Sequence, residues 1–467
     1  MMKNNFNLIL IMLMAAAVLL GCSANKTSYS NKAYLLHNVN IVDVENGGIQ
    51  KDKAIIIDNG IIKAIGKLNA LKKLVKKENQ YDLENKYVIP GLWDMHSHID
   101  KLSDDFEHSK SMLSLYTLNG VTTIREMGGD WNKLKKLKQA SEQSYYYPKV
   151  YTAGPILENK AFVDWVAEVD NDPAFKEQRV RISTKDEVAH KIDSILKLGI
   201  DFIKIRTAAS PEVFFEVSEQ CKKHNVKFCG HVDAKVDLYD AVKSGISSLE
   251  HLDIFQLSGM SESKMDSIAN LMKELGTGYT PTLIYFKKHR IYDKQKIKSF
   301  LNDTTFQDPF RGFVSKSLLK KSRMAFSGAE NSQVPWKEME ANFLKFAKKL
   351  VNNNVSILAG TDGANALVLP GFSLHEEMEL YNTELGMTPL QILQSATINP
   401  SNYFNMQETQ GQIKESYVAN MVVLNSNPLE KISNIKDIDA VINSGVLISK
   451  EERSDKLNQI RSHNINQ

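Results

Sequence analysis

Histidine, lysine and aspartate residues at the ends of short apolar segments are the side chains of this chain best suited to metal chemistry. His96 and His98 stand two positions apart after an expected strand at 93–95, and side chains two apart on a strand point to the same face. Imidazole nitrogens that project together suit one divalent transition metal. Such a pair is weak evidence by itself, but polar residues in similar positions recur along the chain: Lys204, His231, His251 and Asp362.

The elements that must position these residues alternate between short apolar strands and helix-type segments. Residues 184–198 and 211–224, for example, have the apolar spacing of amphipathic helices. This alternation favours an α/β fold, and eight strands over roughly 300 residues predict a (β/α)8 TIM barrel. An open doubly wound sheet is the alternative, but it needs a glycine-rich phosphate turn after its first strand, and none is present there. The expected strands are 93–95, 121–124, 150–153, 202–205, 227–229, 248–249, 279–283 and 355–358.

The predicted barrel places the six polar residues on one rim. Each lies at or near the C-terminal end of an expected strand, where TIM barrels carry their active sites. Lys204 is notable because it stands inside an apolar strand, where a charged ammonium costs desolvation energy. The long, lysine-rich segment 286–347 is predicted to be an insertion after the seventh strand that covers this rim.

Both ends of the remaining chain have a β-strand pattern. Tight-turn signals stand at Asp58-Asn59-Gly60 and Asn443-Ser444-Gly445. Neither end alone could form a core, so we expect residues 34–88 and 405–450 to form one small β-sandwich domain. The barrel domain then comprises residues 89–404.

The N-terminus has the features of a targeting segment. Lys3 precedes an apolar run at 8–20 that is too short to span a bilayer. It ends in Leu19-Leu20-Gly21-Cys22, which resembles a bacterial lipobox. This resemblance implies a signal peptide at 1–21, lipidation of Cys22, a polar tether at 22–33 and a lipid-anchored protein of the bacterial cell envelope.

Composition narrows the possible partners. Lys and Arg number 58 against 55 Asp and Glu, a net charge of +3, so nothing indicates nucleic-acid binding. The remaining cysteines, Cys221 and Cys229, could pair in an oxidising compartment or stay as two buried thiols, and the second state is favoured.

The set of polar residues, taken with its flanking motifs, resembles the amidohydrolase superfamily of metal-dependent hydrolases. Residues 88–98, which contain His96-Ser97-His98, are similar to its entry motif, and 120–126 to its second strand. Residues 387–390 and 396–400 resemble its closing helices, and 411–424 its returning sheet segment. The similarity is closest to the imidazolonepropionase-like and prolidase-like branch, which includes dipeptide-cleaving enzymes.

This resemblance implies a site with two divalent metal ions, for which zinc is the expected metal. In the family, a lysine at this position is often carboxylated on its Nζ and bridges the metals. A hydroxide between the metals attacks the carbonyl, and the aspartate moves the proton to the leaving nitrogen. The implied ligands are His96, His98 and Asp362 for one ion, His231 and His251 for the other, with carboxylated Lys204 between them.

The favoured activity is hydrolysis of an amide C–N bond in a dipeptide or an N-acyl amino acid, a peptidase-like reaction. A single-metal deaminase or cyclic-amide hydrolase of the same fold is one alternative. Deaminases usually carry a glutamate three residues after the strand-five histidine, where this chain has Ala234. A metal-binding or solute-binding lipoprotein without turnover is another alternative.

The sequence identifies neither the residues that bind the substrate nor the oligomeric state. Arg125, Arg206 and Tyr285 also follow strands. Each could bind a substrate carboxylate, although a structural salt bridge or packing is favoured. His375 follows soon after Asp362 and is a further candidate for the pocket, although a surface or helical position is favoured.

Overall fold

The structure is a computed structural model of the chain. It describes residues 29–169, 173–176, 178–251, 254–288, 294–330, 336–364 and 367–466. Cys22, the expected signal peptide at 1–21 and most of the tether lie outside these residues, so their features stay predictions.

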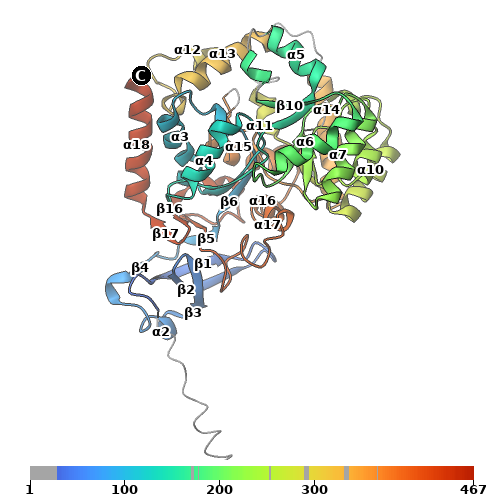
Figure 1. The fold of residues 1–467 in the computed structure, drawn as a ribbon. Coiled ribbons are helices and arrows are strands. Elements are labelled where there is room, and N and C mark those ends of the chain that lie inside the picture. The colour runs from blue at the N-terminus through green and yellow to red at the C-terminus, as the bar shows by residue number, and fades with distance from the viewer. Residues whose placement is uncertain are drawn as a thin grey trace, which may run out of the picture.

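Strands from both ends of the chain form one sheet at one end of the molecule (Figure 1). The strand order is β17-β16-β15-β5-β1-β2-β3, and β4 pairs with β1. The antiparallel pair β15–β5, with Met421 opposite Pro90, joins the two chain ends. The expected β-sandwich is not shown, because the described residues place these strands in a single eight-stranded sheet. Their bounds are β1 (Tyr34–Val42), β2 (Ile49–Asp58), β3 (Ile61–Gly66), β4 (Gln80–Asp82), β5 (Tyr87–Pro90), β15 (Met421–Leu424), β16 (Ile438–Asn443) and β17 (Val446–Ile448).

Two hairpins of this sheet have the turns that the sequence predicts. Asn59 and Gly60 connect β2 to β3 with φ of 50° and 78°, and Ser444 and Gly445 connect β16 to β17 with φ of 52° and 77°. Positive φ at both central residues is the geometry of a two-residue hairpin that matches the twist of the strands. Asparagine, serine and glycine tolerate it because of their small or locally hydrogen-bonding side chains.

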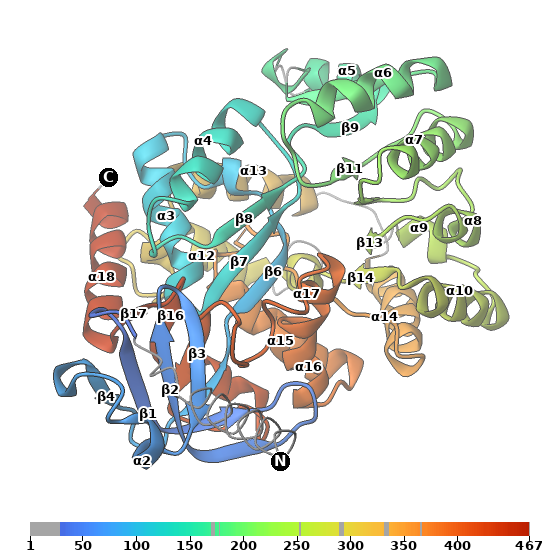
Figure 2. The same ribbon diagram turned by 60° about the horizontal axis from the view of Figure 1, so that its bottom comes forward.

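A second group of strands, all paired in parallel, carries the polar residues singled out above. It consists of a three-stranded sheet in the order β6-β7-β8 and a six-stranded sheet in the order β10-β9-β11-β12-β13-β14. Figure 2 shows these strands with α6, α7, α8 and α10 on their outer side. Their bounds are β6 (Leu92–Ser97), β7 (Val121–Glu126), β8 (Lys149–Thr152), β9 (Ile156–Asn159), β10 (Arg179–Ile182), β11 (Ile203–Ile205), β12 (Phe228–Gly230), β13 (Ser248–Glu250) and β14 (Gly278–Thr280).

Hydrogen bonds outside the regular ladders connect these two sheets, from β8 to the segment before β11 and from β14 through segment 355–359 to β6. The Asp201 amide donates to the Thr152 carbonyl over 2.9 Å on one side. On the other side, segment 355–359 lies between β14 and β6: Leu358 N donates to Tyr279 O over 2.8 Å, and Met95 N donates to Ala359 O over 2.8 Å. The arrangement is of the TIM-barrel type, although the described residues do not form one continuous eight-stranded sheet.

The eighth expected strand, 355–358, is the main difference from the sequence-based expectation. Only one isolated bridge, between Ile357 and Tyr279, occurs there. The neighbouring Ala359 amide donates to Ser395 O instead of to a strand, so a regular ladder does not extend along this segment. The expected strand 279–283 is also shorter, because the chain turns into α11 at Leu283. The short strands β9 and β10 were not expected.

Helices surround the parallel strands, and local sequence explains several of their boundaries. Helix α7 begins after Ser210, whose hydroxyl accepts from the Val213 amide, and α16 begins with the expected capping box of Thr388 and Gln391. The described residues of the insertion 286–347 are largely helical, as its composition predicts. The bounds are α2 (Leu68–Leu71), α3 (Phe106–Leu118), α4 (Trp131–Ser141), α5 (Lys160–Val169), α6 (Lys185–Leu196), α7 (Pro211–Lys223), α8 (Leu238–Lys243), α9 (Ile254–Leu257), α10 (Glu262–Leu275), α11 (Leu283–Phe286), α12 (Lys294–Asn302), α13 (Lys316–Glu330), α14 (Trp336–Asn352), α15 (Phe372–Leu385), α16 (Pro389–Ser395), α17 (Ile398–Tyr403) and α18 (Lys450–Asn466).

Within the described residues, none of these helices combines the length and the apolar character needed to cross a bilayer. The helices of the insertion, α12 and α13, lie with α5 at the end of the molecule opposite the chain-end sheet (Figure 1).

Gly230 illustrates how closely two parallel strands approach beside the site. Its φ is +144°, and a Cβ there would lie 1.9 Å from the carbonyl oxygen of Ile205 on β11. The same oxygen accepts a hydrogen bond of 3.1 Å from the amide of His231. A side chain at position 230 would therefore push β12 away from β11 and displace His231.

We predict that Gly230→Ala destabilises the protein by about 3 kcal/mol or more, because backbone atoms must move. Gly199→Ala is the matched control: its φ is +77° and no atom lies within 4 Å of the added carbon, so backbone conformation alone should cost about 1 kcal/mol. Denaturant unfolding of both variants measures the difference. Equal losses would show that the contact with Ile205 does not restrict position 230.

Candidate metal centre

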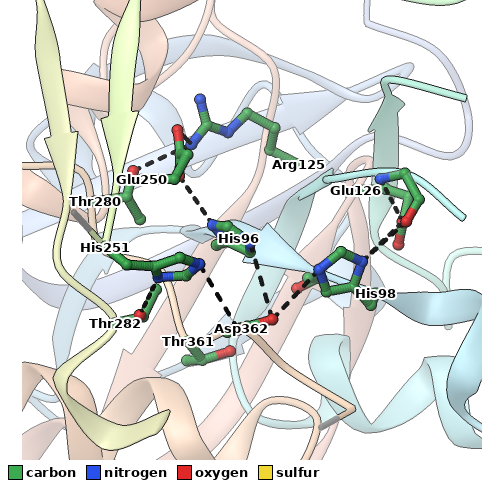
Figure 3. A network of polar contacts seen from close by, with 12 residues as sticks. His96, His98, Arg125, Glu126, Glu250, His251, Thr280, Thr282, Thr361 and Asp362 are labelled. Carbon is green, nitrogen blue, oxygen red and sulfur yellow. Dashed lines mark hydrogen bonds and ion pairs between the residues drawn. The ribbon is translucent and has the colours of Figure 1, made fainter. Parts of the chain in front are cut away.

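Three histidine side chains converge on the carboxylate of Asp362 (Figure 3). The distances from Nε2 of His96, His98 and His251 to the nearest carboxylate oxygen are 3.8, 3.3 and 3.7 Å. His96 lies on β6, and His98 and His251 follow the ends of β6 and β13. Asp362 lies beyond the irregular segment 355–359, so residues far apart in the chain meet at the same strand ends.

His231 extends this cluster, because its ring centroid lies 5.0 Å from that of His251. The His251 ring in turn lies 4.5 Å from the ring of His96. Four imidazoles and one carboxylate thus form one connected group, as the sequence predicts.

The hydrogen bonds of the Nδ1 atoms determine which ring nitrogen faces the centre. Nδ1 of His96 contacts Glu250 Oε2 at 2.9 Å, and Nδ1 of His98 contacts the Gly128 carbonyl at 2.9 Å. These acceptors require a proton on Nδ1, so the neutral ring presents an unprotonated Nε2. Nδ1 of His251 contacts the Thr282 hydroxyl at 2.5 Å. Partners of this kind orient metal-binding histidines in proteins.

Burial keeps these rings neutral. It lowers the pKa of His96 and His231 well below the usual value, and the neighbouring charge of Lys204 acts in the same direction. Burial also lowers the pKa of His251, to about 4. Neutral imidazole is the form that binds a metal ion, so ligation would require no proton loss from these rings near pH 7.

Lys204 lies among these groups without a partner of its own. The residue is 2% exposed, and among the described residues no group forms a hydrogen bond with its Nζ. Burial lowers the pKa of its ammonium group. A buried ammonium without a partner costs free energy of desolvation. Lys204 must therefore either be a neutral amine or interact with a further group that compensates its charge.

A buried ion pair supports His96 from behind. The Arg125 guanidinium donates to Glu250 Oε1 over 2.7 Å, to Ser248 Oγ over 2.8 Å and to the Met95 carbonyl over 2.6 Å. Arg125 is fully buried, so it does not bind substrate, and the favoured salt-bridge interpretation is confirmed. Sequence reasoning missed Glu250, although a glutamate inside the buried strand β13 was a usable signal.

Asp94 connects the two chain segments that meet at the centre. Its Oδ1 accepts from the amides of His96 over 3.1 Å and Thr361 over 3.0 Å, and its Oδ2 accepts from the Thr361 hydroxyl over 2.7 Å. Two residues of the cluster, Asp362 and His251, also have positive φ, 58° and 59°. Such backbone conformations are unfavourable for residues other than glycine and occur often at functional sites.

The remaining candidates divide between the site and the scaffold. The Tyr285 ring stacks 6.2 Å from His251, at the edge of the cluster. Nε2 of the buried His375 contacts the Asn119 carbonyl at 2.9 Å instead, so His375 is structural. Cys221 and Cys229 are free and buried, which agrees with the favoured interpretation.

The donor set fits a divalent metal ion. His96, His98 and Asp362 offer ligand atoms within 4.8 Å of one another, and all three are buried. A second possible group contains His98, Asp100 and Glu126. Glu126, however, already accepts hydrogen bonds from the amides of Ile99 over 2.5 Å and Gly128 over 2.9 Å. Its carboxylate therefore holds these two backbone segments together.

Comparisons with known proteins agree with this geometry. Residues 87–448 match the amidohydrolase family, and the chain therefore belongs to that family of metal-dependent hydrolases. Ochratoxinase from Aspergillus niger is 23% identical over 84% of this chain and 81% of its own. Imidazolonepropionase from Fusobacterium nucleatum subsp. nucleatum is 23% identical over 88% of this chain and 94% of its own.

The fold is similar to that of solved structures of related hydrolases. The crystal structure of a Xaa-Pro dipeptidase with bound methionine superposes with a TM-score of 0.64 at 21% identity, over 89% of this chain and 100% of that one. The family and these neighbours identify the protein as a hydrolase that acts on C–N bonds.

We predict that Glu250→Gln weakens metal binding by about 10- to 100-fold, because His96 loses its anionic partner and Arg125 keeps an uncompensated charge. Metal affinity is measured by titration against a competing chelator. Glu340→Gln is the control, since that carboxylate is also paired with a cation, 2.8 Å from Lys287, but lies outside the metal centre and is partly exposed. Unchanged affinity in Glu250→Gln would mean that Glu250 does not orient His96.

Proposed function

We propose that the protein is a binuclear metal-dependent amide hydrolase whose substrate is a dipeptide or an N-acyl amino acid. The observation that carries the proposal is the convergence of three Nε2 atoms on Asp362 beside a buried Lys204, whose Nζ has no hydrogen-bond partner among the described residues. One metal ion would account for part of this set. A second ion and a bridging anion account for His231 and Lys204 as well.

In this proposal, His96, His98 and Asp362 would hold one ion, and His231 and His251 would hold the other, with zinc as the expected metal. Lys204 would supply a further anionic ligand after carboxylation. Its neutral amine forms an N–C bond with CO₂ and releases one proton to solvent, which leaves a carbamate anion with two ligand oxygens. The burial that lowers the pKa of Lys204 favours the neutral amine that this step requires.

When bound, the two cations would polarise the scissile carbonyl and lower the pKa of a water between them. The protein supplies the geometry: the Nδ1 contacts hold the imidazoles in place, and Asp94 fixes the segment of Asp362. Asp362 is the residue that takes the proton of the attacking water and delivers it to the leaving nitrogen.

A cyclic-amide hydrolase or deaminase with a single metal is the second candidate. The similarity to an imidazolonepropionase over 88% of the chain favours it. Metal content per chain separates the two, because a single-metal enzyme has no use for a carboxylated Lys204. A binding lipoprotein without turnover is disfavoured by membership of a hydrolase family.

We also propose that residues 34–88 with 405–450 and residues 89–404 are the two domains, and that Cys22 anchors the protein to the membrane of a bacterial cell envelope. The anchor rests on the Leu19-Leu20-Gly21-Cys22 motif. One acyl chain gives only marginal binding, so stable attachment requires further acylation at this end of the chain.

For the metal centre, wild-type protein should contain close to two metal ions per chain and hydrolyse members of a dipeptide and N-acyl amino acid library. Lys204→Ala should lose metal and activity because the bridge is gone, and a short carboxylic acid should restore part of both. Lys204→Arg should not be rescued, because a guanidinium stays charged and blocks the space. Elemental analysis and amide hydrolysis are the measurements.

Lys227→Ala is the matched control, since Lys227 starts the neighbouring segment and its pKa is also lowered by burial, but it lies at the opposite end of β12 from His231. Two metals and normal turnover in Lys204→Ala would contradict the bridging role. At most one metal in the wild type would favour the single-metal candidate.

For the anchor, Cys22→Ser should move the protein from the membrane fraction to the soluble fraction, because the acylated thiol is lost. Fractionation of cells and mass spectrometry of the N-terminal peptide are the measurements. Unchanged fractionation together with an unmodified Cys22 in the wild type would exclude lipidation.

A further inference from the structure

Three charged side chains lie side by side: Arg179 at the start of β10, Glu158 near the end of β9, and Arg206 just beyond β11. Glu158 of β9 is 1% exposed and lies between two arginines. Its Oε2 accepts from Arg179 Nε of β10 over 3.1 Å, and its Oε1 accepts from an Arg206 nitrogen, just beyond β11, over 2.9 Å. The sheet order β10-β9-β11 produces this arrangement.

One carboxylate shared by two guanidiniums leaves a net positive charge. Arg179 also lies near Asp100 and Lys101, whose opposite charges offset each other. The Arg179 side chain is 9% exposed, whereas the Arg206 side chain is 38% exposed. Arg206 is therefore the member of the trio that still faces solvent.

Arg206 is also held in one orientation. Besides the contact with Glu158, its guanidinium lies over the Phe162 ring of α5, 5.0 Å from the ring centroid. Among the described residues, Glu158 is the single side chain to which Arg206 donates a hydrogen bond. The other N–H groups of a guanidinium fork remain available for a planar anion.

The position of Arg206 relates this charge to the metal centre. It stands two residues after Lys204, just beyond the C-terminal end of β11, which is the end at which the metal-binding side chains lie. Its charge also contributes to the lowered pKa of His231. In a dipeptide or N-acyl amino acid, only one carbon atom separates the scissile nitrogen from the carboxylate, so a group that binds this carboxylate must stand next to the metal ligands.

We propose that Arg206, positioned by Glu158 and Phe162, binds the free carboxylate of the leaving amino acid and makes the enzyme selective for substrates that carry it. This inference rests on the proposed amide hydrolase. It predicts that carboxamide-terminated substrates and internal peptide bonds are poor substrates, because neither offers an anion at this point. Arg179 completes the buried pair and does not contact the substrate.

The test compares dipeptides and N-acetyl amino acids as free acids and as C-terminal carboxamides, with zinc-loaded protein. Wild type should prefer the free acid. Arg206→Gln should raise KM for the free acid by roughly 10- to 100-fold, the loss expected for a charge-assisted hydrogen bond, with little change in kcat. The loss for the carboxamide should be smaller than the loss for the free acid, and a thermal unfolding curve that matches wild type shows that the variant folds. Arg206→Lys should be intermediate because it keeps the charge without the fork.

Arg181→Gln is the matched control, because that side chain is 39% exposed and forms one ion pair, with Asp164 of α5. It should behave as wild type. Equal KM values for acid and carboxamide in wild type, or equal losses for both in Arg206→Gln, would overturn the inference.

Hydrolysis of neither form by wild type would count against the proposed function itself. In that case calorimetry with the free amino acids decides on Arg206: weaker binding to Arg206→Gln supports the subsite, and equal binding overturns it.

Discussion

The carboxylate of Asp94 accepts hydrogen bonds from both segments that carry the metal-binding side chains, and the centre depends on this connection. One segment is β6 with His96, and the other is the irregular stretch that ends at Thr361. Among the described residues, this segment and Gly363 beyond it form isolated bridges at Ile357 and Gly363, and the Asp94 side chain adds to the backbone hydrogen bonds that hold them. Asp362, which follows this stretch, has a backbone conformation that an isolated chain would avoid.

The sheet formed by the two chain ends supports this region from the other side. Strand β5 pairs with β15 and is followed at once by β6, with the Gly91 amide donating to Asn420 O over 2.8 Å. A Cβ on Gly91 would lie 2.2 Å from the Thr122 hydroxyl oxygen, so the two sheets meet closely at this residue. The position of His96 therefore depends on strands that are more than 300 residues apart in the sequence.

Burial of charge has a different outcome at each polar position of the interior. Arg125 and Glu250 are both fully buried and satisfy each other, which avoids the cost of an isolated charge. Lys204 in the same interior has no such partner among the described residues. Glu158 is shared by two arginines. The pair of Arg125 and Glu250 is part of the scaffold. Lys204 and the arginines around Glu158 have hydrogen-bonding groups that the protein does not use, and these groups can bind a ligand.

The sequence alone was sufficient for features that depend on local chemistry. The hairpin turns at Asn59-Gly60 and Ser444-Gly445, the capping box of Thr388 and most of the parallel strands follow from neighbouring residues. The gathering of His96, His98, His231, His251 and Asp362 was also predictable, because parallel strands bring their C-terminal ends to one edge.

Only the tertiary structure decided which groups those side chains contact. The pairing of Glu250 with His96, the connection made by Asp94 and the trio around Glu158 join residues from different strands. Segment 355–358 has the composition of a strand but forms one bridge, and the expected sandwich is one sheet. Hydrogen-bond partners and strand register depend on the distances between elements that are remote in the chain. Local sequence determines what an element can form, whereas its neighbours in space determine which of those contacts it makes.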